Sequence, residues 1–326
     1  MGKGVTTTPL SSWHTPTPFQ YPILLMATAL LLIFLLATPL FANAAPPFAY
    51  ILQAEKFAKS KEAFVRKIND SHRDIVVIDY SFDGGKSGEW HSKDISAMKK
   101  SDIRRKIIAY LSIGEAENYR PYWKREWSHG KRPSFLLAEN REWKGNYHVR
   151  YWNLEWQRII QTYLDTILAQ GFDGVYLDIV DGYEFFEKGK DNCINPETGR
   201  TYRQDMKAFV QAIASHARQK SPQFMVIQQN AQALFDDEAY MRSLDGIGAE
   251  DVFSDGKKAL SEHESAEAVH NLKKAQAKGL FVVLIEYPTQ PKLQKHVTSK
   301  AARHGLDLLL TDRNLTTIGL FKPAGI

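Results

Sequence analysis

The chain has 326 residues, of which 44% are hydrophobic and 24% charged, values ordinary for a globular protein. Its only cysteine is Cys193, which excludes an intrachain disulfide. The formal net charge is +5, and its few basic stretches are interpreted as solvated helix and loop faces, so no nucleic-acid partner is expected.

The N-terminal region contains an export signal. Every residue from 23 to 41 is apolar or small, and Ala42-Asn43-Ala44 follows as an A-x-A cleavage site. Residues 1–44 are therefore predicted to be a signal peptide, with Ala45 as the new N-terminus. The alternative is an uncleaved membrane anchor, since about 19 apolar residues can just span a bilayer. The first reading predicts a secreted or periplasmic protein, and the second a membrane-tethered one.

The rest of the chain alternates short apolar runs with longer amphipathic ones. Residues 45–70 begin with two prolines and are predicted to form an N-terminal helical cover, followed by one domain over 71–326. Helices are predicted at 94–103, 154–171 and 201–219. Eight strands are predicted at 75–82, 106–114, 147–152, 174–181, 224–231, 246–253, 280–287 and 306–312. Eight strands separated by helices predict a (β/α)8 TIM barrel, because a doubly wound sheet normally has fewer strands and a Gly-rich first turn.

Polar residues, mostly acidic, recur at the predicted strand ends, where barrel enzymes carry their functional groups. They are Asp79, Glu115, Glu117, Asp178, Asp181, the run from Gln228 to Asn230, Glu250, Asp251, Glu286 and Asp312. Side chains alternate along a strand, so Asp178 shares a face with Tyr176, and Glu250 shares one with Gly246 and Gly248. The small glycines are expected to leave room for Glu250 at the barrel mouth.

Clustered carboxylates repel one another and raise one another's pKa. That arrangement suits glycoside hydrolysis, in which one carboxyl is ionised while its partner is protonated. The alternative, that these acids cap the helices after each strand, is as good a reading for Asp181, Asp251 and Asp312.

Five tryptophans fall between residues 123 and 156. Indole faces stack on sugar rings, so Trp123 and Trp143 are predicted to contact a polymer, whereas Trp152 and Trp156 are assigned to the core. The sequence has no HExxH metal spacing and no G-x-S-x-G elbow, so neither a metal hydrolase nor a serine esterase is supported.

Several blocks of the sequence resemble glycoside hydrolase family 114, whose founding activity is endo-α-1,4-polygalactosaminidase. The blocks occur in the same order as in the family and are YLSIGEAENYRPYW (110–123), WKGNYHVRYWNLEW (143–156), GFDGVYLDIVDGYEFF (171–186), IQQNA (227–231) and GIGAEDVF (246–253). The resemblance implies a barrel that hydrolyses α-linked galactosamine polymers without a metal or organic cofactor. It also implies that Asp178 and Glu250 are the catalytic pair.

The same resemblance places Asp79, Tyr110, Glu115 and Asn230 around the bound sugar, and Tyr176 and Glu286 complete the predicted substrate-binding set. By analogy with other barrels that cleave α-glycosides, Asp178 is expected to attack the anomeric carbon and Glu250 to protonate the leaving oxygen. Two alternatives remain open at this stage: a hydrolase of another α-linked glycan, or a non-catalytic carbohydrate-binding protein. The sequence leaves the oligomeric state open.

Overall fold

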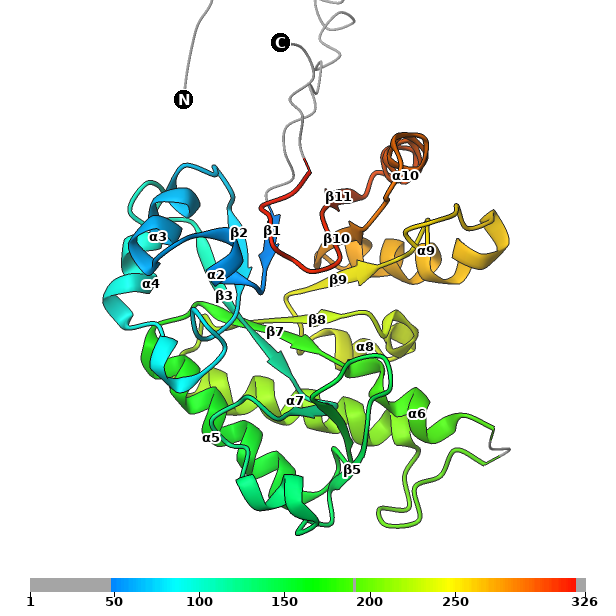
Figure 1. Cartoon of the computed structure of the whole chain (residues 1–326). Coiled ribbons are helices and arrows are strands. Elements are labelled where there is room, and N and C mark those ends of the chain that lie inside the picture. The colour runs from blue at the N-terminus through cyan, green and yellow to red at the C-terminus, as the bar shows by residue number, and fades with distance from the viewer. Residues whose placement is uncertain (1–47, 190–191, 321–326) are drawn as a thin grey trace, which may run out of the picture. The chain divides into compact units, whose positions relative to one another are not determined.

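The computed structural model of the protein describes residues 48–189 and 192–320. Within these residues one sheet of eight parallel strands runs in chain order (Figure 1). Its strands are β1 (Phe48–Ile51), β2 (Ile75–Ile78), β3 (Lys106–Ser112), β7 (Gly174–Asp178), β8 (Met225–Gln229), β9 (Gly246–Glu250), β10 (Phe281–Glu286) and β11 (Asp307–Leu310). The order confirms the predicted (β/α)8 barrel.

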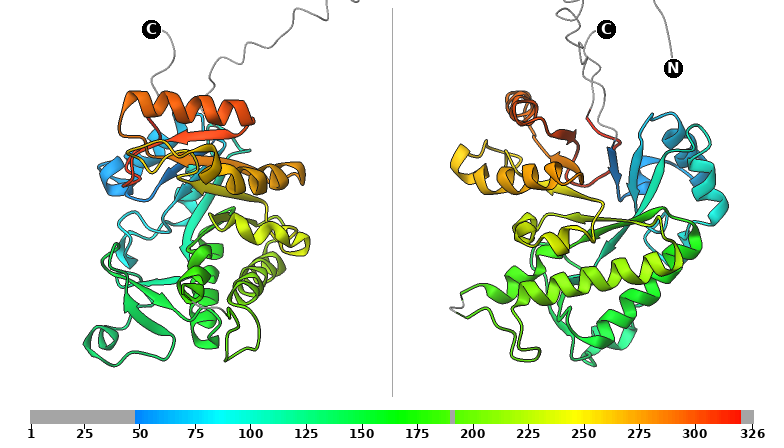
Figure 2. Two further views of the ribbon diagram at one scale, coloured as in Figure 1. Left: turned by 90° about the vertical axis from the view of Figure 1, so that its right-hand side faces the viewer. Right: turned by 180° about the vertical axis from the view of Figure 1, so that it is seen from behind.

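Helices connect the strands and cover the outside of the sheet, and α5 and α7 lie side by side along its back (Figure 2). The α-helices are α2 (Ala54–Phe57), α3 (Lys61–Asn69), α4 (Ser92–Met98), α5 (Leu154–Gln170), α6 (Tyr183–Glu187), α7 (Tyr202–Lys220), α8 (Glu238–Met241), α9 (Glu262–Ala277) and α10 (Pro291–His304). The short 3-10 helices are η1 (Lys86–Gly88), η2 (Arg125–His129), η3 (Val180–Gly182) and η4 (Gln232–Asp236). Among the described residues, none of these helices combines the length and apolar character needed to cross a bilayer.

The first barrel strand corrects one prediction. The predicted helical cover over 45–70 includes β1, which pairs in parallel with β2 from Phe48 opposite Ile75 to Ile51 opposite Ile78. Only α2 and α3, in the remainder of that stretch, are helical. Both faces of β1 are buried, so its sequence FAYI lacks the alternation that distinguishes a strand from a helix. The predicted signal segment, residues 1–44, lies outside the described residues.

A second correction concerns the strand predicted at 147–152. Residues 146–149 form β6 (Asn146–Val149), which belongs to a separate antiparallel sheet with β4 (Glu115–Glu117) and β5 (Leu136–Glu139). This small sheet is an insertion after β3 and extends away from the barrel strands (Figure 2). The prediction omitted β1 and counted β6 as a barrel strand, so the predicted number of barrel strands was still eight. For the same reason β7 and β9 are the fourth and sixth barrel strands, as expected.

The barrel seam between β11 and β1 is joined by the segment that follows β11, and no ladder between these two strands is found in the described chain. The segment passes between the two strands (Figure 1), and the carbonyl oxygen of Leu315 accepts hydrogen bonds from Leu52 N at 3.1 Å and Gln53 N at 3.3 Å. Asp312 shapes this turn by accepting a hydrogen bond from Thr316 N at 3.1 Å. Asp312, for which helix capping was the alternative interpretation, therefore stabilises a turn at the seam.

Alternate residues of the barrel strands form two apolar layers. The interior layer is a small cluster made of Phe48, Tyr50, Val77, Ile108, Tyr110, Tyr176, Ile227, Val283, Ile285, Tyr287, Leu309 and Leu315. The intervening residues, such as Val175, Leu177 and Ala249, pack in the larger outer layer against the helices. This alternation decides which strand-end residues face the barrel mouth.

Candidate active site

Asp178 and Glu250 are the last residues of β7 and β9, which are separated in the sheet by β8 alone. Parallel strands bring their carboxyl ends to the same end of a barrel. Tyr176 lies two residues before Asp178 in the interior layer, while Val175 and Leu177 pack outward. The geometry therefore places both carboxylates at the mouth, on the interior face that the alternation predicted.

Two donors hold the carboxylate of Asp178. The hydroxyl of Tyr110, on β3, donates to Oδ2 at 2.6 Å, and the backbone N of Ile179 donates to Oδ1 at 2.8 Å. Burial raises the pKa of Asp178 to about 8, against the opposing effect of the Tyr110 hydrogen bond. The nearby charges of Glu250 and Asp181 raise this pKa further. Tyr110 is thus a direct partner of Asp178.

Glu250 is held by side chains from the two neighbouring strands. Tyr287, directly after β10, donates to its Oε1, and Gln229, the last residue of β8, donates to its Oε2. Asn230 makes two contacts: its Nδ2 donates to Oε2 at 3.3 Å, and its Oδ1 accepts from the backbone N of Glu250 at 2.8 Å. Burial raises the pKa of Glu250, the hydrogen bond from Tyr287 opposes the rise, and the charge of Asp251 adds to it.

The backbone leaves the strands in a strained conformation at these positions. Ile179, Asn230 and Asp251, each directly after a strand end at the mouth, have φ angles of 55°, 53° and 53°. A β-branched residue such as Ile179 rarely adopts the left-handed region, and strain of this kind clusters at functional sites. Gly114 permits the bend, because a Cβ at that position would lie 2.3 Å from the carbonyl oxygen of Ile179.

Beneath the carboxylates, Tyr176 fills the space that Gly248 leaves open, whereas Gly246 faces Phe281. A Cβ on Gly248 would lie 2.0 Å from the Tyr176 hydroxyl, so this glycine accommodates the tyrosine rather than Glu250 itself. The Tyr176 hydroxyl is buried and has no hydrogen-bond partner among the described residues. Tyr50 packs against Tyr176 with ring centroids 5.0 Å apart, and its hydroxyl donates to Gln229 Oε1 at 3.0 Å.

Asp79 belongs to a buried ion-pair network. Arg120 Nη1 donates to both Asp79 oxygens, at 2.9 and 2.7 Å, and Arg120 Nε donates to Glu117 Oε2 at 2.7 Å. Burial raises the pKa of Asp79 to about 6, while Arg120 acts in the opposite direction. A carboxylate paired in this way braces the wall of the mouth, and Arg120, which the sequence alone did not single out, is its partner.

Glu115 lies on β4 of the small sheet, and its carboxylate is also fully engaged. Asn140 Nδ2 donates to Oε1 at 2.8 Å, Asn146 Nδ2 donates to Oε2 at 3.3 Å, and His148 Nδ1 lies 3.0 Å from Oε1. The ring of His148 stacks on Phe185 at a centroid distance of 4.1 Å. Through Phe185, this network connects the small sheet to α6, which begins just after β7.

Asp181 is a third acid of the mouth. It lies in η3, three residues after Asp178, and its carboxylate accepts a hydrogen bond from its own backbone N–H. Burial raises the pKa of Asp181 to about 7, and the charges of Glu184, Glu250 and Glu115 contribute to the rise. The charge of Glu250 therefore acts on Asp181, whereas no side chain among the described residues donates a hydrogen bond to its carboxylate.

Glu286 points away from the mouth. It is completely buried, and both oxygens are occupied, Oε1 by the backbone N of Phe253 at 2.6 Å and Oε2 by the hydroxyl of Ser254 at 2.7 Å. Burial raises its pKa to about 7. The structure thus does not bring Glu286 to the site, and its neighbour Tyr287 lies there instead. Because both faces of β10 are apolar, alternation in the sequence did not show which residue faces inward.

The tryptophans divide between core and surface. Trp152 and Trp156 are buried, as expected. Trp123 packs against Tyr147 with ring centroids 4.8 Å apart and donates through Nε1 to Ser128 Oγ at 3.0 Å. Trp143 is 55% exposed in the small sheet's connecting turn. Its contact with substrate stays a prediction.

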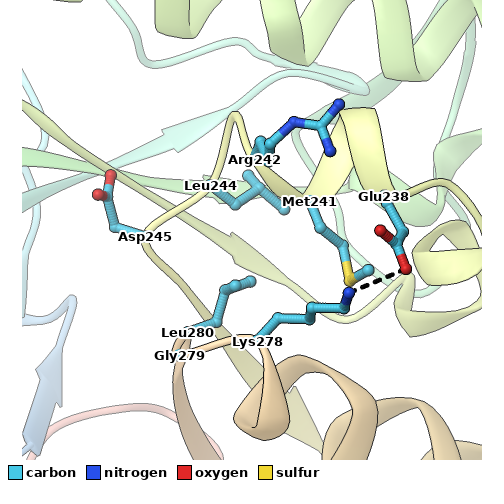
Figure 3. Close-up of a pocket in the computed structure, with 8 residues that line it drawn as sticks. All are labelled: Glu238, Met241, Arg242, Leu244, Asp245, Lys278, Gly279 and Leu280. Carbon is cyan, nitrogen blue, oxygen red and sulfur yellow. Dashed lines mark ion pairs between the residues drawn. The ribbon is translucent and has the colours of Figure 1, made fainter.

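One cavity lies at the amino ends of β9 and β10, the opposite end of these strands from the carboxylates, and Figure 3 shows the residues that line it. Its wall is formed by the segments that precede β9 and β10, and Lys278 and Glu238 form an ion pair of 2.9 Å across it. Its lining comprises Glu238, Met241, Arg242, Leu244, Asp245, Lys278, Gly279 and Leu280. Catalytic groups of barrel enzymes lie at the carboxyl ends of the strands, so this cavity is separate from the candidate site.

No group of three or more His, Cys, Asp or Glu side chains suited to a metal ion is found within residues 48–189 and 192–320. The mouth offers three carboxyls with raised pKa values, those of Asp178, Asp181 and Glu250, and a set of phenol and amide donors. A barrel with such acids at the carboxyl ends of its fourth and sixth strands is typical of TIM-barrel glycoside hydrolases.

The comparison with known families agrees with this class. The chain matches glycoside-hydrolase family GH114 over residues 41–324 and therefore belongs to that family, which makes it a glycosidase. A relative of uncharacterized function from Methanocaldococcus jannaschii is 38% identical over 233 residues, covering 70% of this chain and 64% of the relative. The predicted family is thus confirmed.

Two solved structures share the fold. Aspergillus fumigatus Ega3, crystallised in complex with galactosamine, is 18% identical with a TM-score of 0.58, over 83% of this chain and 92% of that one. The glycoside hydrolase domain of PelA from Pseudomonas aeruginosa is 14% identical with a TM-score of 0.59, over 85% and 98%. At these identities the likeness establishes the barrel, and the substrate has to be argued separately.

Proposed function

We propose that this glycosidase cleaves polymers of α-1,4-linked galactosamine, with or without N-acetylation, within the chain. The observation that carries the proposal is the pair of buried carboxyls, Asp178 and Glu250, at the ends of the fourth and sixth barrel strands. Family membership supports glycoside hydrolysis, and the binding of galactosamine by Ega3, which has the same fold, supports the choice of sugar.

The proposed mechanism has two steps. An Asp178 oxygen attacks the anomeric carbon as its bond to the leaving oxygen breaks, and Glu250 gives its proton to that oxygen. Glu250 then takes a proton from a water molecule, whose oxygen attacks the same carbon and releases Asp178 as a carboxylate. Tyr110 orients Asp178, while Tyr287, Gln229 and Asn230 orient Glu250.

Charge at the mouth supports a cationic aminosugar. The chain as a whole carries +5, yet at the mouth the charges of Glu250 and Asp181 add to the effect of burial in raising the pKa of Asp178, and the charge of Glu250 also raises the pKa of Asp181. A protonated amino group placed among these carboxyls would favour their ionised forms. Substrate binding would therefore help Asp178 to become the carboxylate that attack requires, despite a pKa of about 8 without substrate.

The proposal is tested with Asp178→Asn and Glu250→Gln variants incubated with purified α-1,4-galactosamine polymer, with new reducing ends followed by mass spectrometry. Wild type is expected to release oligomers of mixed length, and each variant to lose at least about 10³-fold in rate because one member of the pair is removed. Asp307→Asn, at the amino end of β11, is the matched control and should retain activity.

The outcomes separate the alternatives. Release of monomer alone would indicate exo action, and cleavage of a different α-linked glycan would replace the substrate while keeping the mechanism. Binding of the polymer by wild type without turnover would indicate a carbohydrate-binding protein and would contradict the proposed reaction.

We also propose that the protein is exported, with residues 1–44 removed before Ala45. The apolar run over 23–41 and the following Ala42-Asn43-Ala44 support this proposal. Export would place the enzyme where an extracellular or cell-surface polymer is found.

A further inference from the structure

Arg313, in the turn that joins the barrel seam, contacts two residues that adjoin Glu250. Its Nη1 donates to Asp251 Oδ2 at 2.7 Å, and its Nη2 donates to Asp251 Oδ1 at 2.9 Å, a bidentate pair. The same guanidinium lies over the ring of Tyr287, with Cζ 4.1 Å from the centroid. A planar guanidinium can stack and form a fork at once, which a lysine cannot do.

Both contacted residues act on Glu250 directly. Tyr287 donates its hydroxyl hydrogen bond to Glu250 Oε1, and the cation over its ring makes the phenol a better donor. Asp251 is the next residue in the chain, and its negative charge acts on the same carboxyl. The arginine therefore strengthens the bond that favours the Glu250 carboxylate and neutralises a charge that disfavours it.

The turn that carries Arg313 is itself well fixed. Asp312 accepts the backbone N of Thr316, and the Leu315 carbonyl receives two backbone hydrogen bonds from the segment after β1. On the other side, the residue before Asp251 ends β9, and the backbone N of Asp251 donates to the Ile285 carbonyl of β10 at 3.2 Å. The guanidinium thus spans β9, β10 and the seam.

We propose that Arg313 is a positioning residue for Glu250. Arg313 holds Tyr287 in place as a hydrogen-bond donor to Glu250 and pairs with Asp251. With both contacts in place, Glu250 can release and recover a proton during catalysis. The inference rests on the proposed function for the role of Glu250, but the geometry of the four residues does not depend on it.

Glu250 also faces groups on other elements, which any change in its titration must take into account. They are Asp178 and Tyr176 on β7, Asp181 in η3, Tyr50 on β1, and Gln229 and Asn230 at the end of β8. None of these contacts Arg313 in the described chain, so they remain in place when Arg313 is replaced.

The test is a direct titration of Glu250 in the full protein labelled with ¹³C at the glutamate carboxyl, followed by NMR. The resonance missing from Glu250→Gln identifies the residue. In Arg313→Gln the pKa of Glu250 is expected to rise by about 0.5 unit or more, because Asp251 loses its counter-charge and Tyr287 its cation. Arg313→Lys, which keeps the charge and loses the fork and stack, should give a smaller rise.

Arg203→Gln is the matched control. Arg203 pairs with Glu187 at 3.0 Å and lies over the Tyr183 ring at 4.9 Å, and its side chain is 44% exposed, against 45% for Arg313. Within the described residues the Tyr183 hydroxyl has no hydrogen-bond partner, so this second arginine–tyrosine stack does not reach Glu250. Its removal should leave the titration unchanged.

The rate profile gives a second reading. With galactosamine polymer, the limb of the kcat/KM profile that Glu250 controls should move to higher pH in Arg313→Gln, because kcat/KM reports the groups that titrate in the free enzyme. An unchanged Glu250 pKa in folded Arg313→Gln, or an equal change in Arg203→Gln, overturns the inference. A shifted pKa in a protein that does not cleave the polymer would support the positioning role and refute the proposed function.

Discussion

Gly248 shows how one missing side chain arranges the barrel interior. The Tyr176 hydroxyl occupies the position that a Cβ would need, and the tyrosine in turn lies beneath both carboxyls. Glycine is required here for space rather than for backbone conformation, because its φ angle is not among the positive ones. The alternation of the sequence placed Gly248 and Glu250 on one face, but it did not identify the neighbour that fills the gap.

Gly248→Ala is accordingly expected to destabilise the protein by about 1–3 kcal/mol through overpacking. Adding Tyr176→Phe should recover part of that loss, since it removes the oxygen that the new methyl group meets. Urea unfolding of the single and double variants measures both effects. Gly85→Ala, where the nearest atom would be 3.6 Å away, should change the free energy of unfolding by less than about 0.5 kcal/mol. Equal stability of Gly248→Ala and wild type would refute the packing argument.

At the scale of elements, the strand ends concentrate acids whose pKa values are raised. β7 contributes Asp178, with a pKa of about 8, and η3 contributes Asp181, with a pKa of about 7. An acid with a higher pKa in the folded than in the unfolded protein binds more protons when folded. The folded state therefore loses stability as the pH rises from about 4, the unfolded pKa, to about 8.

Replacing Asp178 by Asn removes this penalty for one group. We expect Asp178→Asn to gain stability relative to wild type as the pH rises from 5 to 8, by roughly 1–3 kcal/mol over that interval. Urea unfolding at pH 5, 6.5 and 8 measures the difference. If the difference in the free energy of unfolding between Asp178→Asn and wild type stays constant with pH, Asp178 has the same pKa in the folded and unfolded states, which would contradict the prediction.

At the scale of the whole molecule, the described barrel accounts for residues from 48 onward, and the family match begins at residue 41. The proposed cleavage before Ala45 therefore falls just ahead of β1. In an exporting host, the intact mass of the product is expected to correspond to a chain beginning at Ala45. Recovery of a chain that retains residues 1–44 in the membrane fraction would instead support the anchor.

The sequence by itself determined the fold class, the family and the two strand-end acids. Regular alternation of apolar runs with amphipathic segments is a local signal that can be read from the sequence. Asp178 shares a strand face with Tyr176, and Glu250 shares one with two glycines, so the side-chain alternation of the strands indicated their direction. The helices over 154–171 and 201–219 were found nearly to the residue, because their ends carry local signals: Gly171 ends α5, and the Thr201 capping box begins α7.

Only the tertiary structure decided which strands close the barrel and which side chains surround the acids. The sequence did not reveal β1, because a four-residue strand buried on both faces has no periodicity. It assigned β6 to the barrel, because an antiparallel strand of an insertion has the same local pattern as a barrel strand. Three side chains contact acids that are distant from them in the chain: Tyr287 contacts Glu250, Arg120 contacts Asp79, and Arg313 contacts Asp251. Such contacts depend on how twisted strands and their loops pack, a long-range property that no local pattern encodes.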